Sequence, residues 1–329
     1  MSDSAVQTGP SATLAVAPAR RAERAPLAQT LIALVRAPSA ALSVALLVLV
    51  VLAALAAPLV APRDPTDQDV TARLKPPLAR TEEGGLALLG TDALGRDILS
   101  RLIYGSRISL TIGIASVAVA GTLGVVLGLL AGYAGGRWDG LIMRIGDIQL
   151  AIPFLVLALA TVAVVGPSLA NLIVVLGITG WVVYARVIRA ETLSVREREY
   201  VLAARTVGVS PTGIMARHIL PNVASSMIVV ATLQVARMVL FEASLSFLGL
   251  GVPPPTPTWG GMVADGRNYV DTAWWVATIP GLTIFVAVLA MTMVGDRLRD
   301  VLDPRLRGET TASCSPRSCR TSRAPPSGG

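Results

Sequence analysis

Apolar residues fall into six long runs along the chain, and the segments between them carry most of its charge. A helix needs about 20 residues to cross a bilayer core roughly 30 Å thick, and every run is long enough. The pattern predicts an all-α integral membrane protein with six transmembrane helices. The predicted spans are Ala40–Ala61, Ile108–Tyr133, Met143–Val165, Ser168–Val187, Val223–Leu245 and Trp274–Gly295.

The composition also favours a membrane protein. Of the 329 residues, 53% are hydrophobic and 15% are charged, and the mean hydropathy is +0.64. Soluble domains carry about 25% charged residues. The first apolar run is too long for the core of a cleaved signal peptide, so we expect it to be retained. Residues 1–28 and 308–329 have no apolar periodicity and are predicted to be disordered tails.

Arginine predicts the orientation of the spans, because cytoplasmic loops carry an excess of basic residues. Residues 186–217 contain six arginines against three glutamates, whereas residues 250–273 contain two aspartates against one arginine. Both tails are also net basic. These counts predict a multi-pass protein of the cytoplasmic membrane with both termini in the cytoplasm. Because topology accounts for the net charge of +7, no nucleic-acid partner is expected.

A glycine stripe lies within the second predicted span. Gly124, Gly128 and Gly132 recur every four residues and so share one face of a helix. Such a stripe allows a neighbouring helix to approach closely. We predict a packing face, and the alternative is a face that lines a substrate path.

A polar, arginine-rich segment separates the fourth and fifth predicted spans. It contains two small alanines, and Gly208 then permits a turn that a side chain would hinder. Ser210 and Pro211 are suited to cap and begin a second helix. The segment therefore predicts a short helix, a bend and another helix lying across the cytoplasmic face, where it could enter a groove on a partner. The alternative is an ordinary amphipathic connector.

This segment resembles the EAA loop through which membrane subunits of bacterial ABC importers dock onto their ATPase subunits. In that loop Glu-Ala-Ala is followed by a glycine and later by Ile-x-Leu-Pro. Leu202 stands where the acidic residue would be, and His218 stands where the isoleucine would be. The resemblance assigns ATPase coupling to a set of six residues, which are Ala203, Ala204, Arg205, Gly208, Leu220 and Pro221.

Three further stretches resemble the dipeptide, oligopeptide and nickel branch of these importers, and its "C" permease most closely. Gly90–Arg101 is similar to its Gly-Thr-Asp-x-x-Gly-Arg-Asp segment, and Glu242–Gly251 is similar to the exit of its fifth helix. Gly295–Arg305 resembles its C-terminal end, with Arg297 where glycine is usual.

The resemblance implies the transmembrane fold of type I ABC importers. Residues 29–107 would form the first helix and an extracytoplasmic segment. Residues 108–297 would form the five-helix domain, with the coupling loop at 200–222.

The resemblance also implies the function and the partners. The chain would be a permease subunit for dipeptides, oligopeptides or a related small solute such as a nickel complex. Its partners would be a second permease, two ATPases, an extracytoplasmic solute-binding protein and membrane lipid. ATP and Mg²⁺ would be bound by the ATPases, and this chain would be neither an enzyme nor a cofactor-binding protein. A Walker A loop requires Gly-Lys-Ser/Thr, whereas Lys75, the one lysine, precedes Pro76.

Charged residues near the spans are candidates for a gate or a pathway. Arg237 and Glu242 are candidate pathway-lining residues, because charges within spans usually face a cavity or a partner. They lie five positions apart and therefore on different faces of a helix; the alternative is an interfacial or structural role. A second set is a candidate extracytoplasmic gate or binding-protein contact, or else a solvated, self-paired helix: Asp92, Arg96, Asp97 and Arg101.

Two other functions fit the sequence less well. A secondary transporter working alone usually shows internal repeats and broken helices. A membrane enzyme would need paired acids or metal ligands, but His218 is the one histidine. Cys314 and Cys319 lack the further ligands of a zinc site. No catalytic or metal-binding residue is therefore predicted.

Overall fold

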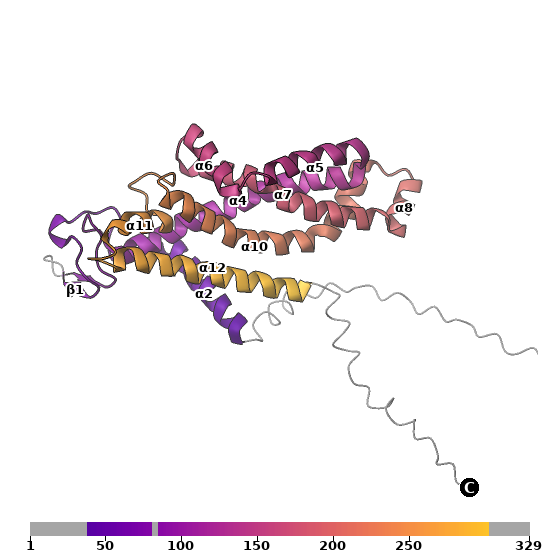
Figure 1. The fold of residues 1–329 in the computed structure, drawn as a ribbon. Helices are drawn as coiled ribbons and strands as arrows, with labels where there is room; N and C mark the ends of the chain where they lie inside the picture. The colour runs from indigo at the N-terminus through magenta and orange to yellow at the C-terminus, as the bar shows by residue number, and fades with distance from the viewer. Residues whose placement is uncertain (1–37, 81–84, 303–329) are drawn as a thin grey trace, which may run out of the picture.

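The computed structural model describes residues 38–80 and 85–302, and this part of the chain is mostly helical (Figure 1). The predicted disordered tails, 1–28 and 308–329, lie outside the described residues. The elements are α2 (Pro38–Leu55), α3 (Ala57–Val60), η1 (Val70–Ala72), β1 (Ala79–Arg80), β2 (Leu86–Ala87), α4 (Ile98–Ala134), α5 (Gly136–Leu150), α6 (Phe154–Val165), α7 (Leu169–Arg196), α8 (Glu199–Thr206), α9 (Pro211–Ile214), η2 (Met215–Ile219), α10 (Leu220–Phe247), α11 (Trp259–Gly266), η3 (Arg267–Tyr269) and α12 (Trp275–Leu302).

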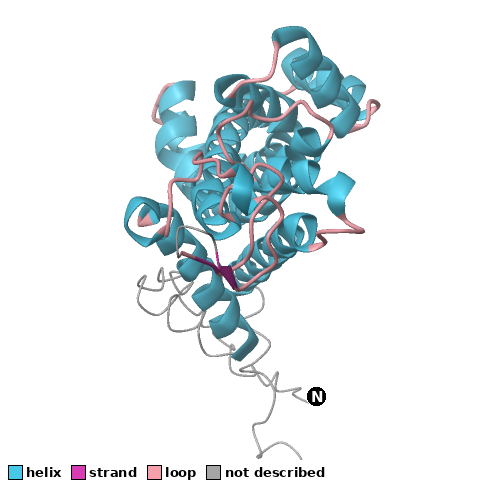
Figure 2. Cartoon of the chain, turned by 90° about the vertical axis from the view of Figure 1, so that its left-hand side faces the viewer, coloured by secondary structure: helices cyan, strands magenta, loops and turns pink. Residues whose placement is uncertain are grey.

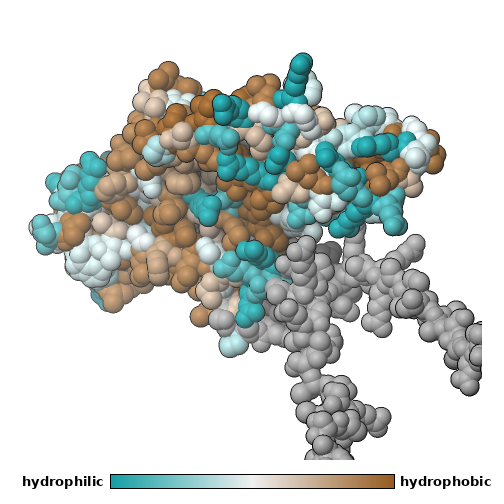
Figure 3. Space-filling model, turned by 45° about the vertical axis from the view of Figure 1, so that its right-hand side comes forward, coloured by the Kyte–Doolittle hydropathy of each residue, from teal (hydrophilic) through white to brown (hydrophobic). Residues whose placement is uncertain are grey.

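The long helices run along one another, with short elements at either end of the bundle. The β1–β2 hairpin and α11 lie at one end, and α8 lies at the other (Figure 1). Viewed from the hairpin end, the helices point towards the viewer and loops cross over them (Figure 2). The surface along the bundle is largely hydrophobic, while hydrophilic residues gather towards its ends (Figure 3). This distribution suits a protein that lies in a bilayer.

The predicted all-α membrane architecture is confirmed, but six separate spans are not. In the described part of the chain, four helical stretches can each cross a membrane by length and composition. These are α4, α7, Pro211–Phe247 and most of α12. The pair α5 and α6 passes the same test only when taken together, which gives up to five spans. The apolar part of α2, Ala40–Leu55, is shorter than these helices.

The run predicted as one span over Met143–Val165 forms two helices. The axes of α5 and α6 differ by 87°, and the break ends at Pro153, the residue that precedes α6. Proline supplies no N–H for a helical hydrogen bond and disfavours helical geometry at Ile152 before it. The apolar pattern continues through this break, so hydropathy alone does not reveal it.

The helix predicted over Ile108–Tyr133 begins ten residues earlier. Asp97 caps α4 by accepting a hydrogen bond from the Ser100 N–H at 2.8 Å. The first turns of α4 mix apolar residues with serine and arginine, and both Ser100 and Arg101 are buried. These polar residues interrupt the apolar run, so hydropathy alone places the start of the helix too late.

The glycine stripe packs α4 closely against α7, as its spacing predicts. This is the most extensive contact between described elements. A Cβ atom added at Gly128 would lie 2.7 Å from the Ala185 carbonyl oxygen, and one added at Gly124 would lie 2.6 Å from the Trp181 carbonyl oxygen. Gly132 meets Thr192 in the same way. The seam can therefore accept no side chain at these positions.

Candidate coupling, gate and pathway sites

The predicted coupling segment forms a short helix and a bend at the end of the bundle (Figure 1). After α7, helix α8 runs over Glu199–Thr206. Gly208 then adopts a φ of +85°, a left-handed conformation that glycine accepts without penalty. The Val209 N–H donates to the Ala204 carbonyl at 3.1 Å and closes the end of the helix. The predicted helix and bend are both present.

The second helix of this segment differs from the prediction. The Ser210 hydroxyl accepts a hydrogen bond from the Gly213 N–H, and Pro211 begins α9, as predicted. This helix does not lie separately across the membrane face. It passes through η2, a π-helical turn, directly into α10, so Pro211–Phe247 is one long stretch. The wide turn precedes Pro221, which has no N–H for the helical ladder.

The coupling segment is anchored on one side and exposed on the other. Val201, Ile214 and Ile219 are buried in a cluster with apolar residues of α4 and α7. On the opposite side, Val207 is 84% exposed and Leu202 is 42% exposed. Among the predicted coupling residues, four are exposed and two are partly buried: Ala203, Arg205, Gly208 and Pro221, then Ala204 and Leu220. The result is a small-residue surface held on a fixed base.

The charged residues at the opposite end form a buried network. Asp92 accepts a hydrogen bond from the Arg96 Nε at 2.7 Å and also pairs with Arg101. Both arginines reach Asp265, at 3.4 and 3.1 Å. Asp92, Arg96 and Arg101 are buried, whereas the Asp265 side chain is 46% exposed. The group is self-paired, as one of the alternatives predicted, but it is buried rather than solvated.

Two residues in this region depart from the sequence-based picture. Asp97 is the cap of α4, accepting hydrogen bonds from the Ser100 N–H and hydroxyl, rather than a member of the ion-pair network. Asp265 belongs to the network but lies more than 160 residues away in sequence from both arginines. No sequence motif predicts an ion-pair partner at such a long separation along the chain.

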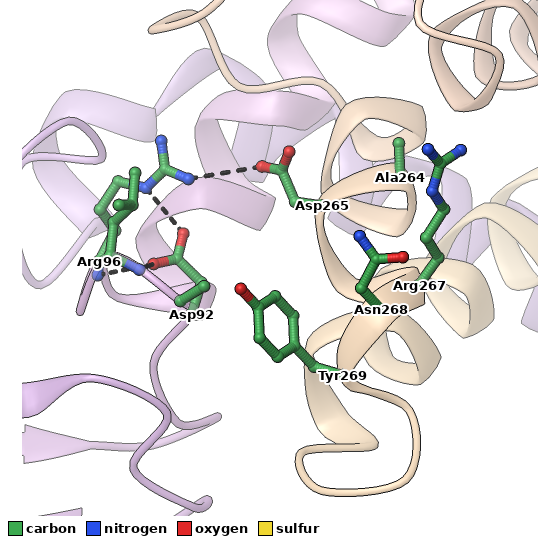
Figure 4. Close-up of a pocket in the computed structure, with 9 residues that line it drawn as sticks. Asp92, Arg96, Ala264, Asp265, Arg267, Asn268 and Tyr269 are labelled. Atoms are coloured by element: carbon green, nitrogen blue, oxygen red, sulfur yellow. Dashed lines mark hydrogen bonds and ion pairs between the residues drawn. The ribbon is translucent and has the colours of Figure 1, made fainter.

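A cavity of about 290 Å³ lies beside the network, between the loop that precedes α4 and the α11–η3 segment. Its charged and polar lining residues are Asp92, Arg96, Asp265, Arg267, Asn268 and Tyr269 (Figure 4). The wall opposite α11 is fixed by a backbone contact. A Cβ atom added at Gly95 would lie 1.7 Å from the Asp69 carbonyl oxygen. The Thr71 hydroxyl, which donates to the Asp69 carboxylate, lowers the pKa of that carboxyl.

The two candidate pathway residues lie on different faces of α10, as their spacing predicts. Glu242 is fully buried and accepts hydrogen bonds from the hydroxyls of Ser109, at 3.1 Å, and Ser246, at 2.7 Å. Ser109 also accepts a hydrogen bond from the Trp259 N–H at 3.3 Å. Glu242 therefore joins α10 to α4 and α11. Arg237 is exposed, and its Nη1 donates to the Gln234 side chain at 3.3 Å.

The helices long and apolar enough to cross a membrane, together with the polar ends of the bundle, define a multi-span membrane protein. Comparison with known families specifies it further. Residues 124–308 match the binding-protein-dependent transport system inner membrane component, and residues 25–77 match the N-terminal TM domain of oligopeptide transport permease C. The chain therefore belongs to the family of binding-protein-dependent transport system inner membrane components.

Relatives match most of the chain. The chain is 49% identical to a di/tripeptide transport system permease protein of Pseudomonas aeruginosa, over 79% of this chain and 86% of the relative. The chain is also 42% identical to a probable D,D-dipeptide transport system permease protein of Escherichia coli, over 83% of this chain and 89% of the relative. A chain of the inward-facing MetNI methionine ABC transporter aligns with a TM-score of 0.50 and 21% identity, covering 61% of this chain and 96% of that one. The last similarity supports the fold alone.

Proposed function

We propose that this chain is a permease subunit of an ATP-driven peptide importer and forms half of its translocation pathway. The names of the Pseudomonas and Escherichia relatives refer to dipeptides and tripeptides, which favours peptides over nickel complexes as the transported substrate. A second, different permease would form the other half. The observation that carries the proposal is the anchored α8–Gly208 surface, which matches the loop that ABC permeases use for docking.

The partners follow from this role. The complex would contain two ATPase subunits, which would hold the ATP and Mg²⁺, and the α8–Gly208 surface of this chain would dock onto the ATPase pair; this chain would bind no cofactor. A solute-binding protein would dock at the opposite end, where the buried charged network supports the mouth. Coupling requires the loop to bind two states of the ATPases with different affinity. The rigid base under α8 would transmit this difference to α4, α7 and α10.

The proposed topology has six crossings and both termini in the cytoplasm. It counts α2 as the first crossing and the bent α5–α6 pair as the third. This order brings the hairpin, α11 and the α6–α7 turn to the outer side and α8 to the cytoplasmic side. The arginine excess in residues 186–217 agrees with that orientation.

The first test is co-purification of partners in a mild detergent. The wild-type chain should recover a Walker-containing ATPase and a second permease. Gly208→Trp should lose the ATPase and keep the permease, because a Cβ at this position faces open space and a bulky group would occupy the docking surface.

Two controls separate bulk from backbone strain. Gly208→Asn tolerates the left-handed conformation and should retain most of the ATPase. Gly140→Trp adds the same bulk at another glycine whose Cβ would meet nothing, and it should retain all of it. Normal ATPase recovery with Gly208→Trp would remove the coupling role. Recovery of the wild-type chain alone, still active in transport after reconstitution, would favour a secondary transporter.

A further inference from the structure

One face of α10 presents an isolated charge within an apolar span. Arg237 is the only charged residue between Pro221 and Phe241, and it lies about 15 Å from the end of α10 at Phe247, at 1.5 Å per residue. Its side chain is exposed on the subunit. A guanidinium at this depth is costly in lipid. This face of α10 therefore meets water or another polar group in the assembled protein.

No acidic side chain in the described ranges pairs with this arginine. The nearest acid in sequence, Glu242, is fully buried and bonded to two serine hydroxyls. Within the described part of the chain, Arg237 donates a side-chain hydrogen bond to Gln234, a buried residue whose side-chain oxygen accepts from the guanidinium at 3.3 Å. Gln234 thus positions the arginine, while most of its donors remain available to a ligand.

An apolar hollow lies on the same face of α10, further towards Phe247. It has a volume of about 400 Å³ and is lined by residues of α6, α10, α11 and α12. Leu240 and Ser244, three and seven residues after Arg237, lie on this wall and share its face by helical periodicity. The distance along the helix from Arg237 to Ser244 is therefore roughly 10 Å.

We propose, on the basis of the proposed function, that this face is a peptide subsite of the translocation pathway. Arg237 binds the C-terminal carboxylate of the passing peptide, and the hollow receives an apolar side chain. Guanidinium and carboxylate form charge-assisted, two-pronged hydrogen bonds. An extended peptide of two or three residues spans about 7–11 Å, which matches the separation between the charge and the hollow.

The test is photo-cross-linking in the reconstituted full complex. The probe is alanyl-photoleucine, a dipeptide with a diazirine on its C-terminal side chain, compared with the same dipeptide as a C-terminal amide. The free acid should label the α10 and α12 segments that line the hollow, as mapped by mass spectrometry. Loss of the carboxylate should reduce this labelling about tenfold or more, because a charge-assisted bond is worth roughly 1.5–3 kcal/mol.

Three variants complete the design. Arg237→Gln should lower labelling by the free acid to the level of the amide, and Arg237→Lys should restore much of it. Gly281→Leu should also abolish labelling, because a Cβ at Gly281 of α12 has no atom within 4 Å and the added side chain fills the hollow without a clash. Each variant should keep the wild-type melting temperature and should co-purify with the second permease and the ATPases, which shows that the complex is intact.

The inference fails if acid and amide label equally, or if Arg237→Gln labels as the wild type does. It also fails if Arg237→Gln releases the second permease, because the arginine then pairs with that subunit. These results differ from failure of the proposed function. In that case the wild-type complex imports no peptide, whereas failure of the subsite alone leaves wild-type import unaffected.

Discussion

The two ends of this protein differ in where their charged side chains lie: they are buried and paired at one end and exposed at the other. At the α11 end, one aspartate and two arginines are buried and paired within the chain. At the α8 end, arginines and small residues are exposed over a base of three buried apolar side chains. The charged groups at the first end are satisfied by partners within the chain, whereas the second end leaves an exposed small-residue surface.

The two ends owe their rigidity to different interactions. The buried network holds the start of α4 against α11 through charge pairs in a low-dielectric setting. The coupling segment is held chiefly by apolar burial, with the Arg205 guanidinium 5.6 Å from the centre of the Tyr133 ring, so most of its exposed side can change without loss of the fold.

The largest effect is expected from Asp92→Ala. Asp92 is the acceptor shared by both buried arginines, and removal of one member of a buried pair typically costs about 3–5 kcal/mol. The melting temperature in detergent should fall steeply. The matched control is Asp265→Ala, whose side chain is 46% exposed and should cost about 1 kcal/mol or less. Equal losses for the two variants would show that the network does not depend on burial.

A smaller loss of stability is expected from Gly128→Leu. The added Cβ would lie 2.7 Å from the Ala185 backbone oxygen, and overpacking of a tight seam costs about 1–3 kcal/mol. Thermal unfolding measures this loss directly. Gly140→Leu adds the same side chain in open space and should leave the melting temperature unchanged. An unchanged value for Gly128→Leu would mean that α4 and α7 separate freely.

The smallest effect on stability is expected from Leu202→Glu. Leu202 is exposed on α8, and surface changes of this kind usually stay within about 0.5 kcal/mol. The variant restores the acidic residue of the EAA motif, so ATPase binding should strengthen severalfold, as measured by titration of the purified ATPase. Thr206→Glu, also exposed on α8, adds the same charge outside the motif and should not strengthen binding. Equal gains would reflect net charge alone.

The sequence predicted features that depend on local pattern. The helical class, the glycine seam and the helix and bend around Gly208 all follow from periodicity or from one residue's conformational freedom. The pattern could not predict features that depend on distant contacts. Asp265 joins the charged network through tertiary packing. Helix α4 begins early because Asp97 caps it and because the polar residues Ser100 and Arg101 are buried against other elements. The 87° break before α6 was hidden because its flanking residues are apolar.

The π-helical turn at Met215–Ile219 determines the direction, around the helix axis, in which each side chain of α10 points. Each residue of an α-helix advances by about 100°, and a turn with i→i+5 bonds is wound more loosely. If these five residues were wound as an ordinary α-helix, the rest of α10 would turn by roughly a quarter of a revolution. Arg237 would then point in a different direction. The direction in which that guanidinium points is thus decided some twenty residues upstream, directly beside the α8–Gly208 bend.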